Sequence, residues 1–285
     1  MNKTAIVTDS TSYIPSDIRN EYGIAMVPLN VMFGDDMYQE ETDITTTEFY
    51  EKMKTTEALP TTSQPSIGLF EETFTRLAKT ADDILVITLS SGISGTFETA
   101  HSAAQMVEGA NVYLFDSEVS CYVQGFYVIT AAKLAEDGMK AKQILSHLEK
   151  MKKRTRAYFM ADDLNHLHRG GRLNGAQMLV GSLLQVKPVL HFDDKKIVPY
   201  EKVRTAKKAI AKILGLLHED AKFGAALDVV VIHANRPEKA EELKKYIKTK
   251  YPDVNVTTSH FGPVIGTHLG EGSLGIGWTD ADLTI

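Results

Sequence analysis

Short β-branched and apolar runs alternate, through the first half of the chain, with longer segments whose apolar residues recur at helical spacing. The short runs predict strands and the longer segments predict helices. The predicted strands are 5–8, 25–31, 84–88 and 112–115, and the predicted helices are 47–55, 66–79, 96–107 and 125–136. This alternation is typical of a mostly parallel sheet with crossover helices, so we expect an α/β fold.

The pattern changes after the charged run at 150–154. The second half predicts strands at 156–160, 228–233 and 255–260, a hairpin with strands 189–192 and 197–203, and helices at 176–186, 205–218 and 237–250. The run at 228–233 is apolar throughout, which indicates a strand covered on both faces. We place a domain boundary near Arg154, with an α/β N-terminal domain at 1–154 and an α/β C-terminal domain at 155–285.

Composition and charge exclude several classes of function. The chain has 285 residues, 43% of them hydrophobic, which is enough for a packed core. Its formal net charge of −6 comes from interspersed acids and bases, so its field repels nucleic acid phosphates and anionic lipid surfaces. We expect no nucleic acid partner.

The single cysteine, Cys121, excludes an internal disulfide and a cysteine-pair zinc site. His166 and His168 lack a carboxylate at helical spacing, and the chain has neither a P-loop nor a G-x-G-x-x-G fingerprint. We therefore expect no metal and no nucleotide cofactor. The apolar run at the amino terminus is too short for a signal peptide. No later run approaches the ~18 apolar residues of a membrane span, so we expect a cytoplasmic protein.

The turn at 90–96, Ser-Ser-Gly-Ile-Ser-Gly-Thr, is the main candidate for chemistry. It follows a predicted strand and precedes a predicted helix, so hydroxyl and backbone N–H groups gather there as in sites for a carboxylate or phosphate. An ordinary helix cap is the simpler alternative. A serine nucleophile at Ser94 is a third, although the glycine after it stands one place too early for a nucleophile elbow.

Other segments offer supporting groups. The loop at 59–66 is rich in hydroxyls and stiffened by two prolines, so it can present Thr62 or Ser63 to a ligand oxygen. The glycine-rich segment at 261–272 carries His268, a possible donor to an anion, or is simply a connection. Asp-Ser pairs end two predicted strands, at 9–10 and 116–117, and either face a ligand or cap the next turn. Forked donors for a phosphate or a partner's carboxylates occur at Arg169, Arg172 and Arg204.

Five motifs, in order along nearly the whole chain, resemble the DegV family. They are I-V-T-D-S-T-S at 6–12, T-S-Q-P-S at 62–66, S-S-G-I-S-G-T at 90–96, G-G-R at 170–172 and G-P-V-I-G-T-H at 262–268. The resemblance implies the two-domain DegV-like (EDD) fold, with a parallel-sheet N-terminal domain, a mixed α/β C-terminal domain and one long-chain fatty acid between them. It extends to the FakB proteins, which present the fatty acid to a separate kinase, FakA, for acyl-phosphate formation and phospholipid synthesis.

The resemblance also implies roles for individual residues. Thr62, Ser94 and His268 are expected to hold the carboxylate, and Arg172 and Arg204 match basic positions for contact with the kinase. The remaining ligand-binding positions that we expect are Ser63, Gly95, Thr96 and Thr267. Such a carrier is not an enzyme and would meet the membrane only transiently. The alternative is a serine hydrolase or a phosphotransferase that acts on a small carboxylic acid.

Overall fold

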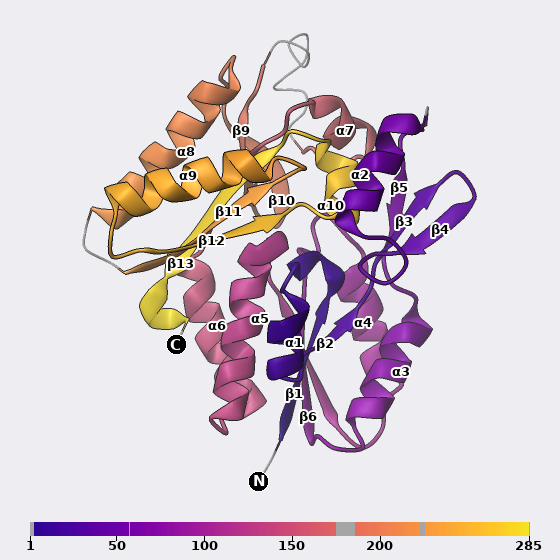
Figure 1. Cartoon of the computed structure of the whole chain (residues 1–285). Helices are drawn as coiled ribbons and strands as arrows, with labels where there is room; N and C mark the ends of the chain where they lie inside the picture. Colours follow the sequence, from indigo (N-terminus) through magenta and orange to yellow (C-terminus); the bar gives the residue numbers. More distant parts are fainter. Residues whose placement is uncertain (1–2, 57, 175–185, 223–225, 285) are drawn as a thin grey trace.

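The computed structural model describes residues 3–56, 58–174, 186–222 and 226–284, and every element below lies within them. A four-stranded sheet occupies the lower part of Figure 1. Its strands are β1 (Thr4–Asp9), β2 (Ala25–Val27), β6 (Asp83–Thr88) and β7 (Asn111–Asp116), in the order β2-β1-β6-β7. All three pairings are parallel, which confirms the sheet type predicted for the first half.

Helices connect these strands. They are η1 (Ser10–Ser12), α1 (Ser16–Glu21), α3 (Ile67–Leu77) and α4 (Thr96–Ala104). The helix α3 begins where Ser66 caps it: the Ser66 hydroxyl accepts a hydrogen bond from the backbone N–H of Leu69 at 3.3 Å. Phe70 and Phe74 of this helix are fully buried against Val7 and Val86 of the sheet. The predicted helices at 66–79 and 96–107 are therefore present, each slightly shorter than expected.

The strand predicted at 25–31 is wrong as a single element. The structure has β2 at Ala25–Val27 and a second strand, β3, at Asn30–Phe33, with Pro28 between them. Proline lacks the backbone N–H that a strand interior needs, so the chain leaves one sheet there and enters another. The second sheet is antiparallel, with the order β4 (Asp36–Gln39), β3 and β5 (Thr61–Ser63). The helix α2 (Thr46–Thr55) lies between β4 and β5 in the sequence.

A six-stranded mixed sheet forms the upper part of Figure 1. Its order is β10 (Lys196–Glu201), β9 (Val189–Asp193), β8 (Arg156–Met160), β13 (Leu274–Asp280), β11 (Leu227–His233) and β12 (Asn255–His260). The helices of this half are α7 (Leu164–Arg169), α8 (Ala206–Ala221), α9 (Pro237–Lys250) and α10 (Pro263–Leu269), followed by the short turn η3 (Ala281–Leu283). The predicted hairpin is β9–β10. The helix predicted at 176–186 lies outside the described residues, apart from its last position.

Two helices, α5 (Cys121–Glu136) and α6 (Ala141–Arg154), lie between the two large sheets. Most of α5 is buried, and its apolar residues occur all around the helix, as expected for a helix covered on opposite sides. One continuous core contains Ile87 of the lower sheet and Val230 and Ile232 of the upper sheet. The boundary predicted near residue 154 coincides with the end of α6, and the division into domains 1–154 and 155–285 stays a prediction.

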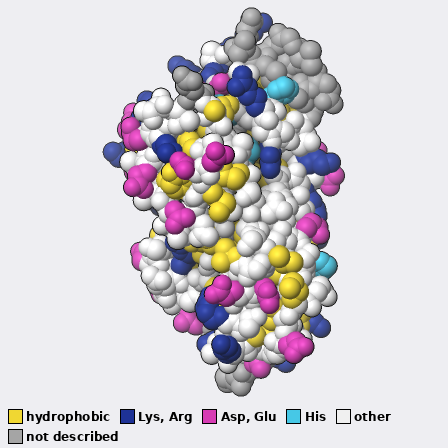
Figure 2. Space-filling model, turned by 90° about the vertical axis from the view of Figure 1, so that its right-hand side faces the viewer, with side chains coloured by type: hydrophobic (Ala, Val, Ile, Leu, Met, Phe, Trp, Pro, Cys, Tyr) yellow, Lys and Arg dark blue, Asp and Glu magenta, His cyan; other side chains and the backbone are white. Residues whose placement is uncertain are grey.

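The surface in Figure 2 shows acidic and basic side chains interspersed over the same face. This arrangement fits the mixed charge pattern of the sequence. Within the described part of the chain, no helix has the length and apolar character needed to span a membrane.

Candidate functional site

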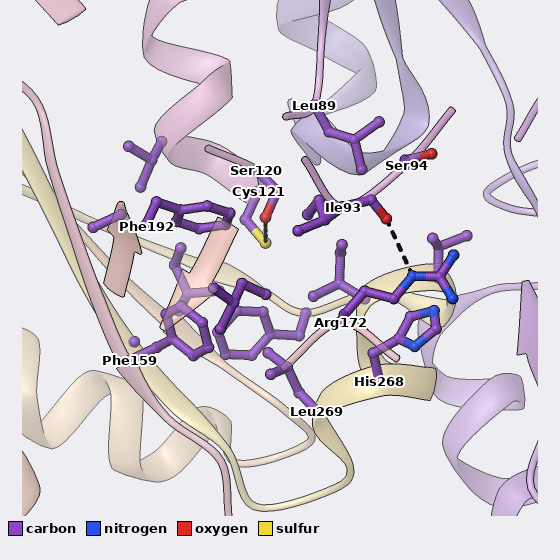
Figure 3. A pocket seen from close by; sticks show the side chains of 18 of the residues that line it. Leu89, Ile93, Ser94, Ser120, Cys121, Phe159, Arg172, Phe192, His268 and Leu269 are labelled. Carbon is purple, nitrogen blue, oxygen red and sulfur yellow. Dashed lines mark hydrogen bonds between the residues drawn. The ribbon is translucent and has the colours of Figure 1, made fainter. Parts of the chain in front are cut away.

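A mostly apolar cavity lies between the two halves of the molecule and holds about 800 Å³ of space not filled by atoms, including the part open to solvent. Figure 3 shows its two ends: Ser94, Arg172 and His268 gather on one side, and Phe159 and Phe192 lie on the other. The apolar part is lined, among others, by Leu29, Leu89, Ile93, Val123, Tyr158, Leu167, Ile197, Ile232, Phe261, Val264, Ile265 and Ile276.

The serines of the predicted hydroxyl-rich turn after β6 have two roles: two of them bond to other parts of the protein, and one lines the cavity. Ser90 is fully buried, and its hydroxyl donates to the backbone carbonyl of Lys195 at 2.6 Å. The Ser91 hydroxyl donates to Oδ2 of Asp116 at 2.5 Å. Both serines are therefore engaged by the protein itself, whereas Ser94 lines the cavity. The turn offers one serine hydroxyl to a ligand.

The two Asp-Ser pairs hold this turn in place. Asp9, at the end of β1, accepts hydrogen bonds from the backbone N–H of Leu89 at 2.7 Å and of Thr11 at 3.0 Å. Asp116, at the end of β7, accepts from the N–H of Ser91 and of Glu118, both at 3.1 Å. Neither carboxylate lines the cavity. Of the two alternatives for these pairs, capping describes the structure.

The end of the turn packs closely against the loop after β5. A Cβ atom on Gly95 would come within 2.9 Å of the Gln64 amide nitrogen, so only glycine fits without a shift. The Ser94 hydroxyl shares a hydrogen bond with the Thr96 hydroxyl at 2.8 Å and accepts from the Thr96 backbone N–H at 3.3 Å. Gly95 and Thr96 thus shape the turn and do not line the cavity.

Thr62 and His268 meet at the polar end. Thr62 Oγ1 lies 2.8 Å from Nε2 of His268, and both side chains line the cavity. Burial, with smaller contributions from Arg172 and His166, lowers the pKa of His268 to about 4. The imidazole is therefore neutral at pH 7, and one of its nitrogens can accept or donate, depending on the tautomer. When the Thr62 hydroxyl accepts from the neutral His268 ring, its own proton is available for donation to a ligand oxygen.

Gly170 and Arg172, in the predicted G-G-R motif, place His268. A Cβ atom on Gly170 would come within 2.3 Å of Nδ1 of His268, so the ring packs directly on the glycine backbone. Arg172 donates from Nε to the carbonyl oxygen of Ile93 at 3.1 Å and from Nη1 to the carbonyl of Gly170 at 2.6 Å. Arg172 also lines the cavity, so it connects α7 to the hydroxyl-rich turn and puts a positive charge near the polar end.

Of the remaining predicted positions, Ser63, Thr267 and Arg204, only Ser63 lines the cavity. Ser63 lines the cavity, and its hydroxyl accepts from the side-chain amide of Asn30 at 3.1 Å. Thr267 is buried, and its hydroxyl donates to the carbonyl of Pro263 at 2.8 Å, away from the cavity lining. Arg204 is exposed, directly before the Thr205 cap of α8, and does not line the cavity.

A serine hydrolase would need a hydrogen bond between Ser94 and His268, and the contacts observed are different. Ser94 bonds to Thr96, and Nε2 of His268 bonds to Thr62. A catalytic histidine has to reach the nucleophile itself. The described residues also contain no group of three or more His, Cys, Asp or Glu side chains that could hold a metal ion.

Sequence reasoning missed the helix that carries His268 and a buried residue that contacts this helix. For the segment at 261–272, the two alternatives were an anion-binding segment and a simple connection, and neither included a helix; the segment contains the helix α10, which carries His268. Glu40 was not noticed, although it is fully buried and accepts a hydrogen bond from the backbone N–H of Val264 at 2.8 Å. Only the apolar sequence around Val264 and Ile265 could have indicated a buried helix.

Comparison with known proteins agrees with this geometry. The model of the DegV protein family matches residues 3–281. The chain belongs to the DegV family. The protein DegV of Bacillus subtilis is 53% identical over 275 residues, which cover 96% of this chain and 98% of that protein. A DegV domain-containing protein of Halalkalibacterium halodurans is also 53% identical, over 98% of this chain and 99% of its own length.

Solved structures of similar proteins share the whole fold. The crystal structure of DegV from Bacillus subtilis, described as a fatty acid binding protein, superposes with a TM-score of 0.94 at 52% identity and covers 98% of this chain and 100% of that one. A stearic acid-binding protein from Eubacterium ventriosum gives a TM-score of 0.87 at 25% identity, over 100% of both chains. The expected DegV-like α/β fold, with a parallel sheet and a mixed sheet, is confirmed.

Proposed function

We propose that this DegV-family protein binds one long-chain fatty acid in the cavity between its two halves. The observation that carries the proposal is the polarity of that cavity, with Thr62, Ser94 and His268 at one end and Phe159 and Phe192 at the other. A ligand that fits has one small anionic or polar group and a long apolar tail. Relatives with the same fold are described as fatty acid binding proteins, which supports this choice.

The acyl chain supplies most of the affinity. Burial of one methylene is worth ~0.8 kcal/mol, so ~14 methylenes contribute on the order of 11 kcal/mol before the costs of ordering the ligand. The carboxylate opposes this gain, because a buried charge without hydrogen bonds is expensive. The Thr62 and Ser94 hydroxyls, the neutral His268 and the Arg172 guanidinium offset that cost and fix the orientation of the ligand in the cavity.

The proposed ligand can be identified by native mass spectrometry of the purified protein, followed by denaturation and lipid extraction. We expect a bound mass of one fatty acid per chain that disappears on denaturation. A chain that carries no lipid and takes up none from added fatty acid would contradict the proposal.

We further propose that the bound carboxylate is presented to a fatty acid kinase, FakA, which forms the acyl phosphate. Two arginines support this step, one beside the bound carboxylate and one on the surface. Arg172 lies at the polar end of the cavity, and Arg204 is exposed before α8. An exposed guanidinium can pair with a carboxylate on a partner, while the fatty acid remains held by residues inside the cavity. Because the kinase uses ATP, this proposal includes a cytoplasmic location for the protein.

The kinase step is tested with Arg204→Glu. We expect reduced acyl-phosphate formation by FakA and unchanged affinity for the fatty acid itself, because Arg204 does not line the cavity. Exposed Lys207, on the first turn of α8, provides the control Lys207→Glu with the same change of charge. Equal rates of acyl-phosphate formation with the wild type and Arg204→Glu would show that Arg204 does not contact the kinase.

A further inference from the structure

Glu40 occupies an unusual position for an acidic residue. It directly follows β4, between the two halves of the molecule, and its side chain is fully buried. The next residue, Glu41, instead forms a salt bridge with Arg19 of α1 at 2.7 Å. A buried carboxyl group is costly unless several donors satisfy it, so the partners of Glu40 indicate what the protein gains from it.

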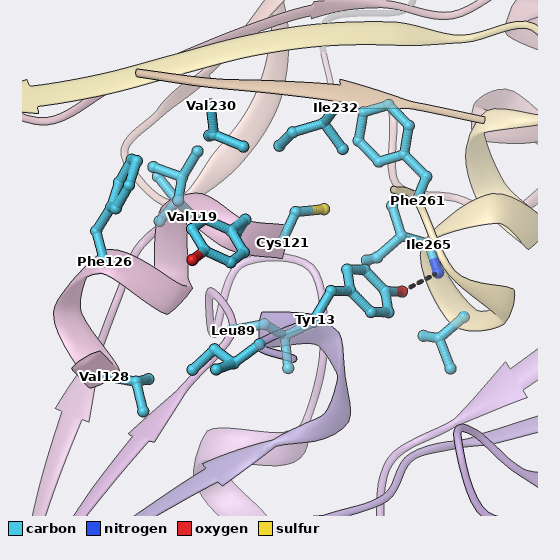
Figure 4. Close-up of a cluster of buried hydrophobic side chains, with 14 of the residues drawn as sticks. Tyr13, Leu89, Val119, Cys121, Phe126, Val128, Val230, Ile232, Phe261 and Ile265 are labelled. Atoms are coloured by element: carbon cyan, nitrogen blue, oxygen red, sulfur yellow. Dashed lines mark hydrogen bonds between the residues drawn. The ribbon is translucent and has the colours of Figure 1, made fainter. Parts of the chain in front are cut away.

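Three donors from separate segments converge on the Glu40 carboxyl group. The Ser10 hydroxyl lies 2.5 Å from Oε2, and the Tyr13 hydroxyl and the backbone N–H of Val264 lie 2.9 Å and 2.8 Å from Oε1. Ser10 Oγ itself accepts from the N–H of Leu29 at 3.1 Å. The Tyr13 oxygen accepts from the N–H of Ile265 at 3.3 Å, the dashed bond in Figure 4. Both hydroxyl protons are therefore free to point at Glu40.

These bonds fix the first turn of α10. Val264 and Ile265 belong to that turn, and His268 stands one helical turn after Val264. The helix also approaches the N-terminal half closely: a Cβ atom on Gly262 would come within 2.4 Å of the Tyr13 ring, and one on Gly266 within 2.6 Å of the Tyr50 oxygen. A short helix held this tightly moves as one piece, so its first turn determines where His268 lies.

We propose that Glu40 is a positioning residue for the ligand headgroup: its carboxylate docks α10 on the N-terminal half and thereby sets the distance between His268 and Thr62. This inference rests on the proposed fatty acid function. Glu40 does not line the cavity, so its effect on the ligand passes through α10.

The ionised form of Glu40 fits the three donors best. Burial raises its pKa to about 7, while the hydrogen bonds from Ser10, Val264 and Tyr13 act in the opposite direction. When the group is protonated, its carbonyl accepts from Val264 less strongly, because charge-assisted hydrogen bonds are roughly twice as strong as neutral ones. We therefore expect α10 to be docked less firmly at pH 6 than at pH 8.

Burial also shifts the pKa values of the titratable groups around Glu40, and it raises that of Asp9, the buried residue before Ser10. Burial raises the pKa of Tyr13 and Tyr50, raises that of Cys121 to about 12, and lowers that of His260, whose ring contacts Tyr13, to about 4. Burial also raises the pKa of Glu41, the carboxyl group paired with Arg19. Glu41→Gln removes a neighbouring carboxyl group that pairs with Arg19 and not with α10, so it is the matched control.

The experiment compares the wild type, Glu40→Gln and Glu41→Gln for binding of palmitate and of methyl palmitate at pH 6 and pH 8. The methyl ester has the same acyl chain and no charge. At pH 8 we expect Glu40→Gln to lose about fivefold in affinity for palmitate, with little change for the ester. At pH 6 we expect the difference between the wild type and Glu40→Gln to shrink. Glu41→Gln removes only a minor contribution to the raised pKa of Glu40, so this variant should stay close to the wild type at both pH values.

The outcomes separate the two proposals. Equal losses for palmitate and its ester in Glu40→Gln would assign Glu40 to general stability and overturn its positioning role. Unchanged palmitate binding in Glu40→Gln would overturn it as well. A wild-type protein that binds neither ligand would instead contradict the proposed fatty acid function.

Discussion

The Oγ1 atom of Thr62 lies 2.8 Å from Nε2 of His268, although 206 positions separate the two residues in the sequence. Thr62 is held on β5 by its pairing with Val31 of β3, and His268 is held on α10. Their contact therefore joins the small antiparallel sheet of the first half to a helix of the second. The polar end of the cavity exists only when both halves are folded and docked.

Removal of the Thr62 hydroxyl is expected to weaken fatty acid binding and leave the fold intact. A hydrogen bond to a charged group is worth about 1.5–3 kcal/mol, so Thr62→Ala should lose on the order of tenfold or more in affinity. Thr61, the neighbour on the same strand, is exposed, and Thr61→Ala is the matched control. Calorimetric titration with palmitate measures both variants. Equal affinities for them would show that Thr62 does not contact the ligand.

The low pKa of His268 predicts a dependence of stability on pH. Burial lowers this pKa from 6.5 to about 4, so the unfolded chain binds a proton between these pH values that the folded protein does not. The contribution to the free energy of unfolding is full above pH 6.5 and is lost as the pH falls toward 4, with a size on the order of 3 kcal/mol.

Denaturant unfolding of the wild type and of His268→Gln at pH 7 and pH 4 tests this expectation. The variant should lose less stability than the wild type on acidification. His260, whose pKa burial also lowers to about 4, remains in both proteins and contributes equally to their unfolding. Parallel losses in the two proteins would mean that His268 is protonated in the folded state.

Gly92 lies under the tip of the β9–β10 hairpin. A Cβ atom on Gly92 would come within 2.3 Å of the backbone carbonyl oxygen of Lys195, so Gly92→Ala has to push the hairpin away from the hydroxyl-rich turn. We expect a loss of about 1–3 kcal/mol in stability, typical of overpacking, and faster release of the fatty acid. Phe192 and Ile197, on either side of that tip, line the cavity.

Gly215 provides the comparison for this variant. It is exposed in the middle of α8, and no atom lies within 4 Å of an added Cβ. Gly215→Ala should stabilise the protein by about 0.5–1 kcal/mol, since alanine favours a helix. Thermal unfolding distinguishes the two variants, and a shift in the same direction for both would contradict the close contact at Gly92.

Most strands of the two large sheets could be predicted because their residues carry the necessary information locally, but β13 (Leu274–Asp280), which lies between β8 and β11, was not predicted. The run at 228–233, for example, is almost entirely apolar, so its sequence alone indicates a strand covered on both faces. The helix α10 could not be predicted, because it has only seven residues, Gly262 directly precedes it and Gly266 lies within it. Its stability comes from contact with Tyr13 and Tyr50, which sequence spacing does not show.

The candidate site was predictable to a similar extent. The family motifs pointed to Thr62, Ser94 and His268, and the structure brings all three to the lining of one cavity. The residue pattern of the turn alone did not separate Ser94 from Ser90 and Ser91, which are engaged by Lys195 and Asp116; only the family resemblance singled out Ser94. Glu40 escaped notice because an acidic residue beside Glu41 resembles an exposed pair, and only the fold buries it.

The most direct test of the account is a crystal structure of the protein with bound palmitate. We expect the carboxylate to lie within about 3 Å of the Thr62 and Ser94 hydroxyl oxygens, with the acyl chain extending toward Phe159 and Phe192. A carboxylate at the phenylalanine end, or palmitate bound outside the cavity, would contradict the account.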